Sequence, residues 1–271
     1  MNNVRKRITL DTNLREVKFS AVILTKNEED NIVDCLDSVL WCDEIIIVDD
    51  MSKDRTIEIV KNLKNKKIKI FNRSIDNDFS AQRNYALEKA NGEWVLFVDA
   101  DERISEGLRF EIEQIIAPQN LFDLKIKGFK IRRTDFLWGK QLTHGEAGNI
   151  KFVRLAKKNA GSWMGKVHEE WKINGKVADL KNLLYHYPHQ SISLFLKEIN
   201  YYTDIRAKEL YDKKINPPPF FAIIFPLGKF IFSFIFKRGF MDGIEGFIFA
   251  VLMSFHSFLV RGKLWILWQK K

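Results

Sequence analysis

The sequence predicts an α/β protein whose Rossmann-like, mostly parallel sheet carries helices on both faces, followed by a helical appendage. Two observations predict the sheet: short apolar runs rich in β-branched residues alternate with stretches of helical apolar spacing, and the turns between them are short. A third observation predicts the appendage, because residues 217–271 are compositionally distinct and hold twelve of the 22 phenylalanines.

The apolar runs set the predicted order of strands and helices. Four runs are expected to be buried strands: 19–24, 44–48, 67–71 and 94–98. Helical spacing predicts four helices between and after them: 30–40, 54–63, 80–90 and 105–116. The chain therefore repeats a strand–helix unit, which is the arrangement that a parallel sheet requires.

Polar and acidic residues stand where three of the predicted strands end. They are Thr25, Asn27 and Glu28 after the first strand, Asp49, Asp50 and Ser52 after the second, and Asp99 and Asp101 after the fourth. Each of them alone is equally typical of a turn or a helix cap. Because the carboxyl ends of parallel strands meet at one edge, the three sets together predict a nucleotide crevice in which carboxylates hold a divalent cation. No Gly-x-Gly-x-x-Gly follows the first strand, which excludes a dinucleotide fingerprint.

The pattern of charged and apolar residues changes after residue 117. Charged and apolar residues alternate over 125–133 and 150–155, which predicts half-exposed strands around the sheet, with a loop over 138–149 between them. A further strand is predicted over 177–186, and one long helix over 191–214. The predicted division is a polar leader, a domain of two halves and a tail: 1–17, 18–117, 118–216 and 217–271.

The tail, residues 217–271, contains two apolar stretches, 220–236 and 247–260. Each is shorter than the roughly 20 apolar residues of a spanning helix. The tail also carries seven basic and only two acidic residues. Short, aromatic-rich, basic-edged helices are typical of the interface of an anionic membrane. The alternatives are a hairpin packed on the domain or on a second subunit, and a spanning hairpin.

The net charge and the cysteine content limit which binding partners and which cellular compartment are expected. A formal net charge of +9 indicates an anionic partner. Much of the excess charge flanks apolar segments and no recognition motif occurs, which favours a membrane surface over nucleic acid. Only Cys35 and Cys42 occur, so a reducing compartment is indicated. Together with the tail, this predicts a peripheral protein on the cytoplasmic face of the inner membrane.

Four motifs carry a resemblance to a known family: Thr25-Lys26-Asn27-Glu28-Glu29, Val48-Asp49-Asp50-Met51-Ser52-Lys53-Asp54, Gln82-Arg83-Asn84 and Asp99-Ala100-Asp101. In this order and at this spacing, the first 110 or so residues resemble the GT-A catalytic domain of glycosyltransferase family 2. Two later motifs, Val167-His168-Glu169 and Leu184-Tyr185-His186-Tyr187, are similar to a bacterial branch that includes lipopolysaccharide core glucosyltransferases.

The resemblance implies a nucleotide-sugar donor, UDP-linked by preference, bound by the first half of the domain, with the acceptor bound by the second half. The residues that it implies for the donor are Thr25, Asn27, Glu28, Asp50, Ser52, Arg83 and Asp99. It also implies Mg²⁺ or Mn²⁺, held by Asp101 with Asp99, to stabilise the leaving diphosphate. His186 is a further candidate metal ligand, with an ordinary packed or capping histidine as the equal alternative.

The acceptor hydroxyl needs a general base, for which Glu169 is the first candidate and Glu170 the second. These neighbours point to opposite faces of an extended segment, so only one of them can serve. The Glu-Asp and Gln-x-x-Arg-Trp signatures that many family members carry are absent. His168 is expected to orient its neighbours. Three tryptophans are expected to pack in the core rather than on sugars: Trp138, Trp163 and Trp171.

The function predicted from these residues is inverting, metal-dependent transfer of a sugar to a hydroxyl of a lipid-linked glycan such as a lipopolysaccharide core. One alternative is transfer to polyprenyl phosphate, an acceptor that is already ionised and needs no base. The other is a catalytically idle GT-A scaffold at the membrane. The presence of both Asp99 and Asp101 argues against the scaffold, because an idle site has no use for a metal.

Overall fold

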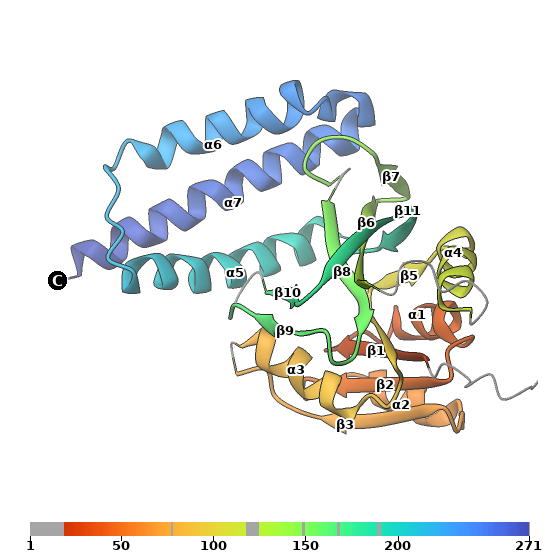
Figure 1. Ribbon diagram of the computed structural model, residues 1–271. Helices are drawn as coiled ribbons and strands as arrows, with labels where there is room; N and C mark the ends of the chain where they lie inside the picture. Colours follow the sequence, from red (N-terminus) through yellow and green to blue (C-terminus); the bar gives the residue numbers. More distant parts are fainter. Residues whose placement is uncertain are drawn as a thin grey trace, which may run out of the picture. The chain divides into compact units, whose positions relative to one another are not determined.

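The computed structural model describes residues 19–76, 78–117, 125–147, 150–166, 169–188 and 191–270 (Figure 1). The chain forms two compact units, each built from separate stretches. The first unit comprises Met1–Asp99, Glu106–Phe129 and Val153–Asp179, and the second unit comprises Ala100–Ser105, Lys130–Phe152 and Leu180–Lys271. The predicted leader and the predicted role of His168 lie outside the described residues. The division into leader, halves and tail stays a prediction.

The first unit holds the predicted parallel sheet. Its strands run in the order β3 (Ile68–Asn72), β2 (Glu44–Asp49), β1 (Phe19–Thr25), β4 (Trp94–Asp99) and β8 (Ile150–Lys157). The pairs β1–β2, β2–β3 and β1–β4 are parallel, and β8 is antiparallel to β4. The prediction of a mostly parallel sheet in this part of the chain is confirmed.

Helices cover both faces of this sheet. The four predicted helices form as α1 (Ile32–Val39), α2 (Thr56–Asn62), α3 (Phe79–Lys89) and α4 (Glu106–Ile116). On one face, Val22, Val48 and Phe97 pack against Ala86 and Leu87 of α3. Because strand side chains alternate between faces, the intervening residues point the other way. These are also fully buried: Ala21, Ile23, Ile45 and Ile47.

Further strands complete both units. In the first, β9 (Gly161–Met164) and β10 (Glu170–Ile173) pair antiparallel. In the second, β6 (Ile126–Leu137), β11 (Lys176–His186) and β5 (Glu102–Ile104) are neighbours in that order, and β7 (Lys140–Leu142) pairs with β6. The strands β5, β7 and β9 were not expected, and β7 lies in the predicted loop over 138–149. Strands of three or four residues are too short for periodicity to reveal them.

The helices of the second unit correct one prediction about the tail. They are α5 (Ile192–Asp212), α6 (Phe221–Ile231), the π-helix η2 (Phe232–Phe236), the 3₁₀ helix η3 (Gly239–Asp242) and α7 (Gly243–Gln269). The predicted apolar stretch over 247–260 is only the middle of α7, because the polar residues that flank it are helical too. By length and composition, the helical segment Gly239–Gln269 is long and apolar enough to cross a membrane, because it contains an 18-residue stretch with a mean hydropathy of 1.7.

The tail helices are buried on one side only. Figure 1 shows α6 and α7 side by side, and α5 alongside α7. The packed side is held by Phe195 and Ile199 of α5 against Phe249 and Leu252 of α7. Many large apolar side chains of the tail are instead exposed: Ile223, Ile224, Phe225, Leu227, Ile231, Phe232, Ile235, Phe236, Phe240, Met241, Ile244, Phe247, Val251, Phe255, Phe258, Trp265 and Ile266. An exposed apolar surface of this size is typical of a binding face.

Candidate functional site

The loops after β1 and β2 are bonded to each other. Thr25 is paired with Asp49, so the two strands end level. The Asn27 N–H donates to Ser52 Oγ at 2.9 Å, and the Lys53 N–H donates to Asn27 Oδ1 at 2.7 Å. The Ser52 hydroxyl in turn donates to Asp49 Oδ1 at 2.5 Å. The structure thus brings Asn27 and Ser52 together, as neighbours in one rim of hydrogen bonds.

Asp50 and Glu28 have partners in the same rim. Asp50 Oδ2 lies 2.6 Å from Lys26 Nζ, and Asp50 Oδ1 accepts the Ile75 N–H at 2.8 Å. Glu28 Oε2 accepts a hydrogen bond from Asn31 Nδ2 at 2.8 Å. The Thr25 hydroxyl oxygen is buried and has no hydrogen-bond partner within the described part of the chain.

The end of β4 carries an ion-pair cluster in the first unit, formed by Arg83, Asp99, Arg154 and Glu169 and called here the arginine cluster. Arg83 Nη1 lies 3.0 Å from Asp99 Oδ1, and Arg83 Nη2 donates to Asp99 Oδ2 at 3.1 Å. Arg154 Nη2 donates to the same Oδ2 at 2.7 Å. Arg83 Nε donates to Glu169 Oε1 at 2.7 Å. One guanidinium therefore joins Asp99, at the end of β4, to Glu169, just before β10.

The neighbouring groups keep Asp99 ionised and hold the Arg83 guanidinium in place. Burial alone would raise the pKa of Asp99, but the nearby guanidiniums of Arg154 and Arg83 outweigh it and hold this pKa well below its ordinary value. The Arg83 guanidinium also lies over the Trp163 ring, 4.7 Å from its centroid. Trp163 stacks on Trp171 with ring centroids 5.4 Å apart, and both are buried. The prediction that these two tryptophans pack in the core is confirmed.

The two candidate bases have very different environments. The Glu169 side chain is 13% exposed and bonded to Arg83, whereas the Glu170 side chain is 67% exposed and paired with the exposed Lys172. Glu170 belongs to β10, and Glu169 directly precedes that strand. The structure therefore groups Glu169 with Arg83 and Asp99.

A second polar cluster lies in the second unit. His186, at the end of β11, is paired across to Glu102 of β5, which follows Asp101 directly. His186 Nε2 lies 3.1 Å from Asp101 Oδ2, and His186 Nδ1 lies 2.8 Å from Asp135 Oδ1 on β6. We call Asp101, Asp135 and His186 the histidine cluster. Burial would lower the pKa of His186, but Asp101 and the two hydrogen bonds outweigh it and raise this pKa to about 9.

The histidine cluster supplies donors suited to a divalent cation. Within the described residues, no group of three or more His, Cys, Asp and Glu side chains is arranged to hold a metal ion. Two donors do face each other, Asp101 Oδ2 and His186 Nε2, at 3.1 Å. Adjacent ligands of an octahedral ion with bonds of about 2.1 Å are about 3.0 Å apart. The pair therefore fits two neighbouring coordination positions, which leaves the others to water and substrate phosphate oxygens.

Sequence reasoning missed Arg154 and Asp135. Arg154 lies in β8 between Val153 and Leu155, and its side chain is only 6% exposed. Asp135 lies in β6, and strands are depleted of aspartate, so a carboxylate inside a strand was the available signal. The prediction ended that strand at Arg133, two residues too early to include Asp135.

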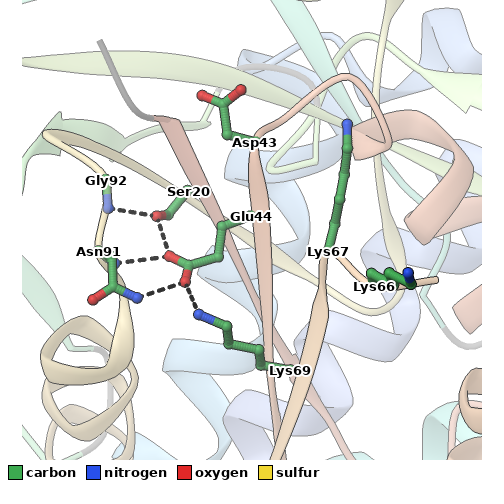
Figure 2. A pocket seen from close by; sticks show the side chains of 8 residues that line it. All are labelled: Ser20, Asp43, Glu44, Lys66, Lys67, Lys69, Asn91 and Gly92. Atoms are coloured by element: carbon green, nitrogen blue, oxygen red, sulfur yellow. Dashed lines mark hydrogen bonds and ion pairs between the residues drawn. The ribbon is translucent and has the colours of Figure 1, made fainter. Parts of the chain in front are cut away.

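A cavity of the first unit lies at the strand ends opposite the arginine cluster. It encloses about 300 Å³ and is lined by residues that include Ser20, Glu44, Lys69 and Asn91, near the amino ends of β1 and β2 (Figure 2). Glu44 accepts hydrogen bonds from Ser20 Oγ at 2.7 Å and from Lys69 Nζ and Asn91 Nδ2, each at 2.6 Å. Ligands of parallel sheets bind at the carboxyl ends, so this cavity is not the candidate site.

The parallel sheet with acidic residues at the carboxyl ends of β1, β2 and β4 defines a Rossmann-like α/β protein. Residues 20–202 match the family model Glycosyl transferase family 2, and the chain belongs to this family. It is 30% identical over 258 residues to an uncharacterised glycosyltransferase of Rickettsia typhi, covering 91% of this chain and 86% of that one.

Two further comparisons extend over nearly the whole chain. The lipopolysaccharide core biosynthesis glycosyltransferase LpsC of Rhizobium meliloti is 28% identical over 256 residues, covering 92% of this chain and 93% of LpsC. The mannosyltransferase PcManGT from Pyrobaculum calidifontis, solved with GDP-Man and Mn²⁺, superimposes with a TM-score of 0.53 at 13% identity, over 94% of this chain and 88% of that one. The latter likeness shows a shared fold.

Proposed function

We propose that this glycosyltransferase moves a sugar, with inversion, from a UDP-sugar to a hydroxyl of a lipid-linked glycan such as a lipopolysaccharide core, and that it depends on Mg²⁺ or Mn²⁺. The observation that carries the proposal is the pair of metal donors, Asp101 Oδ2 and His186 Nε2, at 3.1 Å in a chain of this family. The lipopolysaccharide acceptor is supported by the similarity to LpsC along almost all of both chains.

The nucleoside of the donor would bind at the rim formed by the loops after β1 and β2. Thr25 ends β1 beside this rim, and its buried hydroxyl has no hydrogen-bond partner in the described residues. Both oxygens of Asp50 are engaged, but a carboxylate has about four acceptor positions and can still accept the N–H of a base. Asn27, Glu28 and Ser52 would shape this rim through their hydrogen bonds.

The arginine cluster would hold the donor beyond the nucleoside. Asp99, kept ionised by Arg83 and Arg154, accepts hydrogen bonds and does not donate them, which suits a ribose hydroxyl. Asp101 and His186 are the residues that would hold the cation. When bound, Mg²⁺ or Mn²⁺ would neutralise the charge that develops on the departing diphosphate, so no general acid is required.

Glu169 would be the general base that accepts the proton of the attacking hydroxyl. It is mostly shielded from solvent, and its bond to Arg83 fixes one carboxylate oxygen, which leaves the other to face a substrate. Attack from the side opposite the leaving diphosphate gives inversion. Glu170 is the weaker candidate, because its exposed side chain is screened by water and by Lys172.

The tail would place the enzyme on the cytoplasmic face of the inner membrane. Its exposed apolar side chains and basic residues suit an anionic bilayer surface, while the length of α7 keeps a spanning arrangement as the alternative. Flotation with phosphatidylglycerol vesicles tests this proposal. Phe236→Glu, at a 73% exposed position, should reduce flotation, and Phe110→Glu, at a 63% exposed position of α4, should not. Equal flotation of both variants and wild type would show that the tail does not contribute to membrane binding.

The activity is tested by release of nucleotide from a panel of UDP- and GDP-sugars with Mn²⁺ or Mg²⁺, with and without a lipid extract as acceptor. Acceptor-stimulated, metal-dependent release of one nucleotide, lost in both Asp101→Ala and Glu169→Gln, is the expected result. Activity that survives in Glu169→Gln alone points to another base or to a phosphate acceptor. No turnover of any donor, with nucleotide binding intact, would favour an idle scaffold.

A further inference from the structure

His186 is held by carboxylates at both ring nitrogens. Its Nδ1 lies 2.8 Å from Asp135 Oδ1, and its Nε2 lies 3.1 Å from Asp101 Oδ2. Asp135 is 5% exposed and lies in β6, within the segment of that strand that pairs with β7. The bond to Asp135 is the shorter of the two and involves the more buried carboxylate.

The chemistry of the two bonds differs once a cation is present. A metal ion needs the lone pair of Nε2, so the bound ring must be neutral and must carry its single proton on Nδ1. An ionised carboxylate only accepts hydrogen bonds, so Asp135 favours the ring form that is protonated on Nδ1. Asp135 therefore selects the form of the ring in which Nε2 is free to bind a cation.

We propose that Asp135 is a positioning residue that fixes the orientation and tautomer of His186, so that Nε2 is presented together with Asp101 to a divalent cation. This inference rests on the proposed metal site and assigns a role to a residue outside the recognised motifs. A carboxylate behind a metal-binding histidine also makes the ring a more basic ligand.

A second ion pair braces Asp135. Arg133 Nε lies 3.5 Å from Asp135 Oδ1, and Arg133 Nη1 lies 3.6 Å from Glu102 Oε1. Glu102 is fully buried and is the strand partner of His186. Oδ1 of Asp135 thus lies near both the Arg133 guanidinium and the imidazole, so rotation of this buried carboxylate would disturb both contacts.

The test is the affinity of the full-length protein for Mn²⁺, measured by electron paramagnetic resonance in the presence of UDP. Asp135→Asn keeps the shape of the side chain and removes its charge, and we expect Mn²⁺ to bind about 10–100-fold more weakly. Asp135→Glu restores a carboxylate and should recover part of the affinity. His186→Ala should weaken binding at least as much as Asp135→Asn.

The second unit supplies a matched control. His144 Nδ1 lies 3.0 Å from Asp242 Oδ1, which is a histidine–carboxylate bond of the same kind with no part in the proposed metal site. Asp242→Asn should therefore leave Mn²⁺ affinity unchanged, even if it lowers the thermal midpoint. Equal weakening by Asp242→Asn and Asp135→Asn would overturn the inference, since it would reflect general destabilisation.

A spectroscopic readout separates positioning from packing. With ¹⁵N-labelled histidine, Mg²⁺ and UDP, the wild-type His186 signals should show a proton on Nδ1 and none on Nε2, and Asp135→Asn should lose this single tautomer. If wild type binds Mn²⁺ and needs His186, but Asp135→Asn binds equally well, the inference is wrong and the proposed metal site stands. If wild type binds no Mn²⁺ with UDP, both are wrong.

Discussion

Asp99 and Asp101 are separated by one residue in the chain and belong to one sequence motif, yet their surroundings differ. Both oxygens of Asp99 are engaged by guanidinium groups, those of Arg83 and Arg154. Asp101 instead meets the imidazole of His186, a group that can give up its proton and bind a metal. Two guanidinium groups already neutralise the charge of Asp99, so a metal ion would stabilise it less. A carboxylate that faces a titratable imidazole, as Asp101 does, would be stabilised more.

The difference suggests a division of labour inside the Asp-Ala-Asp motif. In our proposal Asp99 serves the donor sugar or ribose and organises Glu169 through Arg83, and Asp101 serves the cation. The prediction from sequence that Asp99 is also a metal ligand stays a prediction. Because Asp99 is engaged by the arginine cluster, it is a weaker candidate ligand than Asp101. Substitutions that separate stability from metal dependence test this division.

The largest effect is expected at Arg83. Its guanidinium bonds Asp99 and Glu169, and its side chain is 6% exposed, so Arg83→Met leaves two carboxylates without this partner. Breaking a buried ion pair by removing one partner costs about 3–5 kcal/mol. Urea unfolding at pH 7 measures the loss. Arg55→Met is the control, because its pair with Glu29 is on the surface, with the Arg55 side chain 73% exposed, and it should cost far less than Arg83→Met. Equal costs at both sites would contradict the structural role of the arginine cluster.

Asp99→Asn should destabilise the protein by about 3 kcal/mol, at the lower end of the range for a broken buried pair. The amide keeps the shape of the side chain but loses the charge that holds Arg83 and Arg154. Urea unfolding again measures the loss, and Mn²⁺ binding in the folded variant should persist. Loss of Mn²⁺ binding without loss of stability would reverse the roles assigned to the two aspartates.

The contrast between these aspartates also shows what the sequence can and cannot predict. The four strands of the parallel sheet were predictable because buried β-branched runs such as Ile45–Val48 have few other stable arrangements. The strand-end residues were predictable because the ends of parallel strands meet. The partners Arg154 and Asp135 were not, since each comes from a strand more than thirty residues away from the motif, and only packing decides which side chains meet.

Glu44 provides a carboxylate with a similar network at the opposite ends of the strands, where no function is expected (Figure 2). Burial alone would raise the pKa of Glu44, but hydrogen bonds from Lys69, Asn91 and Ser20 outweigh it and lower this pKa to about 2. A lowered folded-state pKa gives stability that is present above the unfolded-state value and is lost as the pH falls toward 2. Glu44→Gln should cost about 2 kcal/mol at pH 7, after allowance for solvent screening.

The unfolding free energies of wild type and Glu44→Gln, measured by urea from pH 7 to pH 3, should begin to approach each other below about pH 4.5, and their difference should be smallest at pH 3. A difference that is constant with pH would mean that shape, and not charge, links Glu44 to its partners. Turnover at pH 7 should not change, which separates this carboxylate from Asp99.

The smallest effect on stability is expected at Asp101. In Asp101→Asn the His186 ring keeps its shorter bond to Asp135 and no buried guanidinium loses its partner, so the cost should stay below about 1 kcal/mol. The same variant should lose metal-dependent turnover, because an amide oxygen is a poorer ligand for Mg²⁺ than a carboxylate. A small change in unfolding free energy together with lost Mn²⁺ binding is the opposite of the result expected for Asp99→Asn. If Asp101→Asn instead unfolds the protein and Asp99→Asn does not, the charge that holds the end of β4 in place belongs to Asp101.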